Sequence, residues 1–216
     1  MYYQFLIEDQ SGATLIRIIM EKVKKRDPDI TYDIKAFKGI GGFTKKNTVR
    51  ETKTGKLLND LATFLKGFNK SLQTFEAVVF IVLDNDNNDP VQFKSRLEEV
   101  AAQNMITIDY VFCLAIEEME AWLLGDEAAV ISAYPHARIS ELRKYEQDSI
   151  CGTWEKLADV IYKGGQQAMK KQHYSEQGRI KSEWALKIGP LMDISQNKSP
   201  SFNYFIGEVL KRTAVA

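Results

Sequence analysis

The chain has 216 residues, of which 44% are hydrophobic and 27% are charged. This composition excludes a wholly disordered protein, and the length fits one elaborated domain or a domain with an extension. The formal net charge of +0 excludes a general attraction to nucleic acid or membranes, so any such attraction requires a local patch.

The cysteines and the N-terminal stretch predict the compartment. Cys113 and Cys151 are too few for a disulfide framework and indicate a reducing environment. The stretch MYYQFLIEDQ has no basic leader before an apolar run, and no segment reaches the roughly 18 apolar residues of a membrane span. We therefore expect a cytoplasmic protein without membrane attachment.

The first part of the chain alternates short apolar runs with amphipathic stretches. This alternation is typical of βα units and predicts an α/β fold with a mainly parallel four-stranded sheet flanked by helices. The apolar runs predict strands at residues 2–8, 31–37, 75–83 and 109–116. The amphipathic stretches between them predict helices at residues 13–25, 57–68 and 90–103.

The alternation stops after Gly125 and Asp126, and the remaining chain reads as helices and loops. The expected helices lie at residues 127–134, 153–162, 183–192 and 202–212. Their aromatic residues, such as Trp154 and Trp184, can pack on the sheet. We divide the chain into an α/β core, residues 1–126, and a helical extension packed on that core, residues 127–216.

Acidic residues follow three of the four predicted strands. Glu8 ends the first strand, Asp84 and Asp86 follow the third, and Glu117 and Glu120 follow the fourth. Because ligands gather outside the carboxyl ends of parallel strands, we expect these carboxylates to converge at one edge. Glu117 and Glu120 are three residues apart and would share one face of a helix.

A convergent group of carboxylates predicts a metal site. The negative charges repel one another, and a hard divalent cation such as Mg²⁺, or Mn²⁺ in its place, neutralises them. Asp84 and Asp86 are then metal ligands, and Glu8 is a ligand or a general acid or base. The alternative is structural, because Asp and Asn also form turns and cap helices after strands.

Several stretches resemble a known family, and together they extend over nearly the whole chain. They are FLIED, VLDND, EEMEAWLLGD, DSICGTWEKLA and NKSPSFNYF. They resemble the Toprim-like bacterial family named domain of unknown function 4276. The Toprim fold is the catalytic core of topoisomerases, bacterial primases and overcoming-lysogenization-defect nucleases.

The resemblance implies a fold, a site and a setting. It implies a Toprim-like sheet whose acidic site consists of Glu8, Asp84 and Asp86, with Glu117 and Glu120 as further ligands. It also implies a nuclease-like, Mg²⁺-dependent protein of bacterial phage defence. The sequence departs from the family pattern next to Glu8. Asp9 stands where relatives have glycine, and Gly12 stands where they have a second acid.

Two further segments are candidates for nucleic-acid contact. In the basic, glycine-containing loop KGIGGFTKKN and the residues after it, Lys45, Lys46 and Arg50 can contact phosphates. The alternative is a solvated charged face. In the tail NKSPSFNYF the resemblance suggests that Lys198 and Ser201 line the site, whereas the residues alone indicate a capped C-terminal helix.

Three classes of function are consistent with these features. The first is a metal-dependent nuclease-like enzyme or phosphoryl transferase that acts on nucleic acid or nucleotides. The second is a non-catalytic module that binds a nucleotide or a protein and serves as the accessory to an ATPase. The third is a purely structural interaction protein that needs no metal. Turnover separates the first two, because only the enzyme forms product.

Overall fold

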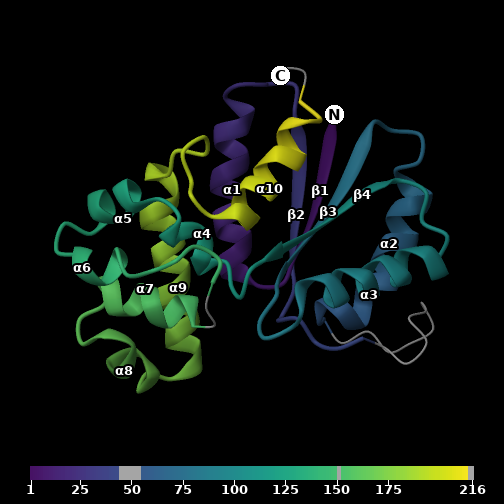
Figure 1. Cartoon of the computed structure of the whole chain (residues 1–216). Coiled ribbons are helices and arrows are strands. Elements are labelled where there is room, and N and C mark those ends of the chain that lie inside the picture. The colour runs from purple at the N-terminus through teal and green to yellow at the C-terminus, as the bar shows by residue number, and fades with distance from the viewer. Residues whose placement is uncertain (44–54, 150–151, 214–216) are drawn as a thin grey trace.

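The computed structural model describes residues 1–43, 55–149 and 152–213. Its four strands are β1 (Tyr2–Ile7), β2 (Thr31–Ala36), β3 (Ala77–Asp84) and β4 (Asp109–Ala115). They form a single parallel sheet in the order β2-β1-β3-β4 (Figure 1). The predicted α/β fold with a parallel four-stranded sheet is confirmed.

Helices connect the strands and then continue the chain. The connecting helices are α1 (Gln10–Lys24), α2 (Leu57–Ser71) and α3 (Pro90–Gln103). After β4 follow α4 (Glu120–Leu124), α5 (Glu127–Ala133), α6 (Ile139–Leu142), α7 (Thr153–Ile161), α8 (Gly165–Lys170), α9 (Tyr174–Ile188), the 3₁₀ turn η1 (Gly189–Leu191) and α10 (Pro200–Leu210).

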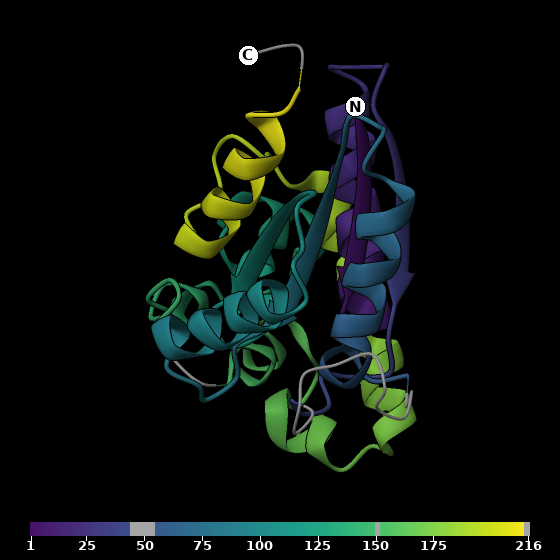
Figure 2. The ribbon, with the colours of Figure 1, turned by 90° about the vertical axis from the view of Figure 1, so that its right-hand side faces the viewer.

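Helices cover both faces of the sheet, which explains why β1 and β3 are apolar on both sides. Figure 2 looks onto the face covered by α2 and α3, where Leu6, Ile81 and Phe112 are buried. The other face packs against α1 and α10 around Phe5 and Phe80, and α9 lies against α1. Residues of the helical extension therefore belong to the same hydrophobic core as the central strands.

Helix α9 begins well before its predicted start. The sequence pattern places a helix at residues 183–192, whereas the structure begins it at Tyr174 and ends it at Ile188. In the first half of α9, Ile180 is the only buried residue, and most of the other residues are polar. It is helical because α9 packs alongside α1 (Figure 1), and this tertiary contact overrides the weak local pattern.

Three of the sequence stretches that carry the family resemblance meet beside the end of β4. The indole Nε1 of Trp122 donates to Ser201 Oγ at 3.0 Å, and Asn197 Nδ2 donates to the Trp122 carbonyl oxygen at 2.8 Å. Asp148 accepts hydrogen bonds from the Ser199 hydroxyl at 2.9 Å and from the Ser201 amide at 2.7 Å.

We name this set of residues the α4–α10 junction: Trp122, Gly125, Asp148, Asn197, Ser199 and Ser201. Gly125 belongs to it because its carbonyl oxygen accepts from the Lys198 amide at 2.9 Å. The junction satisfies the buried polar groups where α10 begins, and such groups are costly when left unpaired. It fixes α10 against the sheet.

Among residues 1–43, 55–149 and 152–213, no helix combines the length and the apolar character needed to cross a lipid bilayer.

The junction predicts that Gly125→Ala destabilises the protein. Gly125 has ordinary helical dihedral angles, so its conformation permits alanine. A Cβ atom would nevertheless lie 2.0 Å from Asn197 Oδ1, and Asn197 is buried and held by two hydrogen bonds. We expect the free energy of unfolding to fall by about 1–3 kcal/mol, measured by urea denaturation.

Gly207→Ala in α10 is the matched control, because a Cβ there meets no described atom within 4 Å. Alanine is the better helix former, so this variant should be unchanged or slightly more stable. Equal stability of the two variants would show that Asn197 moves freely and that the junction is not rigid.

Candidate functional site

The carboxyl ends of β1 and β3 open into a cavity of about 680 Å³. Glu8, Asp84 and Asp86 border it, as do residues of α9, the start of α7 and the loop after β2. β1 and β3 are the two central strands, where the strand order reverses, and α/β sheets bind ligands at this point. These three predicted carboxylates therefore border the same cavity.

Glu8 and Asp84 are neighbours at the bottom of the site. Glu8 Oε2 accepts a hydrogen bond from the Asp84 amide at 3.2 Å, and Asp84 Oδ1 accepts from the Met119 amide at 3.0 Å. Burial is the main reason that the pKa of Glu8 rises to about 7. Burial and the adjacent charge of Glu8 raise the pKa of Asp84 well above its ordinary value.

The glycine loop after β2 closes over the end of β1. The Gly39 amide donates to the Glu8 carbonyl oxygen at 2.9 Å, and the backbone of Ile40 favours the charged Glu8 carboxylate, which opposes the larger effect of burial on its pKa. Gly39 has a φ of 101°, which glycine adopts without strain. The described part of this loop therefore positions a carboxylate.

Asp86 has a left-handed backbone with a φ of 46°. Its amide donates to the Glu117 carbonyl oxygen at 2.9 Å, which ties the loop after β3 to the loop after β4. Asp tolerates this conformation better than most residues. Burial is the main cause that raises the pKa of Asp86.

Lys181 of α9 lies among these acids, and the sequence analysis missed it. Its side chain is 18% exposed, and Nζ lies 3.3 Å from Glu120 Oε2 and 3.5 Å from Glu118 Oε1. Burial opposes its charged form, but the carboxylates of Glu120, Glu118 and Asp84 outweigh burial and raise the pKa of Lys181 above its ordinary value. Lys181 therefore remains a cation at neutral pH.

Glu117 and Glu118 hold the start of α7. The Thr153 amide donates to Glu117 Oε2 at 2.9 Å, and the Trp154 amide donates to Glu118 Oε2 at 3.2 Å. The residue before the helix, Gly152, has no side chain to cap it. The two carboxylates replace that cap and lie at the positive end of the helix dipole.

The expectation that Glu117 and Glu120 share a helix face is wrong. α4 begins only at Glu120, and Glu117 has a left-handed φ of 65°. Glu118, which lies between them in the sequence, borders the cavity. Glu120 is buried and forms an ion pair with Lys181 without a well-aligned hydrogen bond. Burial raises the pKa of Glu120 to about 7 despite this cation.

The departures from the family pattern at Asp9 and Gly12 have structural consequences. Asp9 caps α1, because its Oδ1 accepts from the Gly12 amide at 2.8 Å, and it also borders the cavity. A Cβ atom at Gly12 would lie 3.0 Å from the Ile7 side chain. An acid at position 12 would therefore require β1 and α1 to separate slightly.

The carboxylates fit a magnesium ion in part. Within the described ranges, no three carboxylate, imidazole or thiolate side chains are grouped so that they could hold a metal ion. Mg²⁺ usually keeps several waters and needs only one or two carboxylates beside substrate phosphates. Glu8 and Asp84 supply hard oxygen donors, and a divalent cation relieves the repulsion that, after burial, raises the pKa of Asp84.

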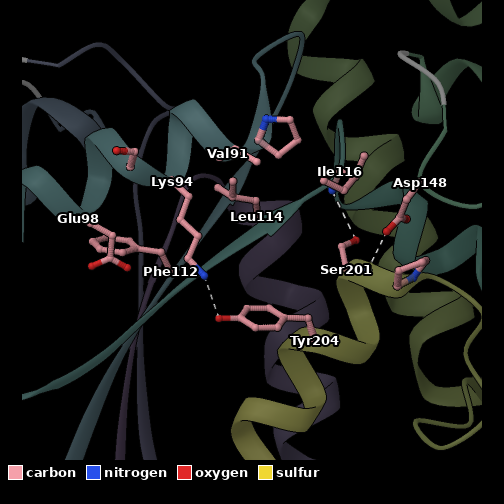
Figure 3. Close-up of a pocket in the computed structure, with 12 residues that line it drawn as sticks. Val91, Lys94, Glu98, Phe112, Leu114, Ile116, Asp148, Ser201 and Tyr204 are labelled. Atoms are coloured by element: carbon pink, nitrogen blue, oxygen red, sulfur yellow. Dashed lines mark hydrogen bonds between the residues drawn. The ribbon is translucent and has the colours of Figure 1, made fainter.

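The remaining predicted residues lie elsewhere. Ser201 borders a groove of about 620 Å³ between α3 and α10, where its hydroxyl accepts from the Ile116 amide at 3.4 Å (Figure 3). Lys94 bridges this groove to Tyr204 at 3.2 Å. Lys198 is exposed and borders neither the cavity nor the groove. The candidates Lys45, Lys46 and Arg50 lie outside the described residues.

Fold and site define an α/β protein with an acid-lined cavity at the switch point of a parallel sheet. The family model described as Domain of unknown function (DUF4276) matches residues 7–210, so the chain belongs to that family. The matched range includes every residue that borders the cavity. No curated protein matches the chain, and no solved structure does.

The geometry predicts that Lys181→Met is destabilising and that the loss depends on pH. At pH 8 the variant leaves Glu118, Glu120 and Asp84 without their cation, and we expect a loss of about 2–4 kcal/mol in the free energy of unfolding. At pH 5 the loss should be smaller, because Glu120, whose pKa is about 7, is then protonated and neutral. Urea denaturation at both pH values measures the difference.

Lys187→Met on the same helix is the matched control. Lys187 pairs with Glu183 at 2.6 Å, but its side chain is 51% exposed, and exposed pairs contribute about 0–1 kcal/mol. A Lys181→Met loss that is equally small, or that is unchanged between pH 5 and pH 8, would contradict the assigned charge balance.

Proposed function

We propose that this protein acts on phosphodiesters with Mg²⁺ or Mn²⁺, as a nuclease-like protein with a Toprim-like site. The observation that carries the proposal is the pair Glu8 and Asp84, which lie half-buried side by side at the switch point of the sheet. Purely structural carboxylates are seldom buried next to each other without relief of their repulsion. A site for a hard cation and a phosphate explains the arrangement.

The acidic residues near the cavity divide into those that would bind the metal and those that already stabilise the protein structure. Glu8 and Asp84, with Asp86 in the same cavity, would hold the metal. The bound metal would neutralise phosphate charge and activate a water molecule. Glu117 and Glu118 are already occupied in capping α7, and Glu120 is paired with Lys181.

Glu8 and Lys181 have properties that suit phosphate chemistry. In the metal-free protein the pKa of Glu8 is about 7, so Glu8 could exchange a proton near neutral pH and serve as a general acid or base as the alternative to binding the metal. Lys181 borders the cavity and stays charged, so it can attract a phosphate oxygen. Its pairing with Glu118 and Glu120 holds the ammonium group in place.

The second candidate is a non-catalytic module that binds a nucleotide or a protein partner. It is favoured by Lys181, which already neutralises part of the acidic charge without a metal. Such a module could serve an ATPase. The ATPase partner, the cytoplasmic location and the role in phage defence stay predictions of the sequence.

The test compares Glu8→Gln and Asp84→Asn with the wild type. We expect Glu8→Gln to reduce metal-dependent cleavage of single- or double-stranded DNA or RNA by about 10²–10⁴-fold, the usual contribution of a positioned acid or base. Asp84→Asn should weaken Mn²⁺ binding in calorimetry. Because it removes one of two repelling charges, it should also raise the melting temperature of the metal-free protein.

Glu99→Gln is the control, since Glu99 is exposed on α3 and lies outside the cavity. It should keep wild-type cleavage and Mn²⁺ affinity. Equal cleavage by wild type and Glu8→Gln would exclude Glu8 as the acid or base. Mn²⁺ binding without cleavage by the wild type would favour the binding module.

A further inference from the structure

One side of α9 borders the acidic cavity, and the proposed metal chemistry uses only part of it. Tyr174, Gln177, Gly178 and Lys181 all border the cavity. Their spacing of three and four residues places them on one side of the helix. We call these four residues the α9 face. It runs from the cavity opening at Tyr174 to the buried ammonium group of Lys181.

Tyr174 presents its ring at the outer end of the α9 face. It is the first residue of the helix, and it is 86% exposed. A single exposed aromatic residue is ordinary on a protein surface. At the border of a cavity, however, its ring offers a flat surface on which a nucleic-acid base can stack, and such stacking does not depend on the base.

Gly178 leaves the middle of the α9 face bare. It lies inside a regular helix, where alanine is the more stable residue. A Cβ at Gly178 would meet no described atom within 4 Å, and its φ is not in the left-handed region. Neither packing nor backbone conformation requires glycine, and the missing side chain leaves room for a ligand in the cavity to approach the helix backbone closely.

Lys181 completes the α9 face at its inner end. It follows Tyr174 by seven residues, which is about 10 Å along a helix. A nucleotide spans such a length when its base lies at one end and its phosphate at the other. The cavity volume of about 680 Å³ is typical of small-ligand pockets, so the space suits one nucleotide and excludes a duplex.

We propose that the α9 face binds one unpaired nucleotide of a single-stranded nucleic acid. The base stacks on Tyr174, the sugar passes over Gly178, and the phosphate reaches Lys181 beside Glu8 and Asp84. A base within a duplex is already stacked and paired, so it is not free to stack on Tyr174. This inference rests on the proposed function and names its substrate class.

The test measures binding separately from turnover. A short fluorescein-labelled single-stranded DNA is titrated, with Mg²⁺ present, against the full chain carrying Glu8→Gln, and fluorescence anisotropy gives Kd. Adding Tyr174→Ala should raise Kd by about 10- to 100-fold. Adding Gly178→Ala should raise Kd several-fold and also raise the melting temperature by about 1–4 °C, because alanine stabilises the helix.

Matched controls are available elsewhere in the chain. Tyr204 is 42% exposed on α10, and Gly67 lies in α2 with no described atom within 4 Å of a Cβ. Tyr204→Ala and Gly67→Ala should leave Kd unchanged. A Gly178→Ala variant that is more stable yet binds more weakly cannot owe its weaker binding to unfolding.

The form of the ligand is tested with the same protein. A duplex of the same sequence should bind more weakly than the single strand. Equal binding of the duplex would overturn the assignment, as would competition by adenosine monophosphate at the same concentration as the strand. Wild-type affinity in both Tyr174→Ala and Gly178→Ala would also overturn it.

The two proposals fail in different ways. Loss of single-strand binding in the α9-face variants, together with no metal-dependent cleavage by the wild type, would support the nucleotide site and overturn the phosphodiester chemistry. Cleavage by the wild type, with unchanged affinity in the variants, would overturn the nucleotide site and support the chemistry.

Discussion

The site depends on one electrostatic constraint, which is that acidic residues at the ends of parallel strands must share a buried edge. Glu8 and Asp84 are placed next to each other by the register of β1 and β3, and Glu120 is buried nearby. Buried carboxylates of like charge are costly. Lys181 reduces this cost from the opposite side of the cavity. The position of α9 against the sheet is thus coupled to the charge of the site, and neither can change without affecting the other.

Some acids near the site cap helices, and others border the cavity without capping a helix. Asp9 caps α1, while Glu117 and Glu118 cap α7. The stretches that mark the family divide in the same way. EAWLLGD and NKSPSFNYF meet in the α4–α10 junction, where Trp122 and Ser201 hold α10, whereas FLIED and VLDND supply the cavity. A sequence stretch typical of the family can therefore serve to hold the fold together, as Trp122 and Ser201 do.

Much of the fold could be predicted because strands and helices of the core have strong periodic patterns. The strand ends also predicted that Glu8, Asp84 and Asp86 lie at one edge, because parallel strands bring their carboxyl ends together, and all three border the same cavity. The first half of α9 could not be predicted, because it is polar, contains Gly178 and is helical only through tertiary contact. That half contributes Lys181 and Tyr174. The capping role of Glu117 was equally hidden, because the helix it caps begins at Thr153, far along the chain.

The order of the parts along the chain has a consequence for synthesis. The acids that border the cavity lie at residues 8–118, whereas Lys181 lies in α9, at residues 174–188. A ribosome adds these parts in that order, at roughly 5–20 residues per second. A nascent chain therefore exposes its carboxylates for several seconds before the compensating cation emerges. The cavity can close only after α9 has left the ribosome, so a partly made chain lacks a complete site.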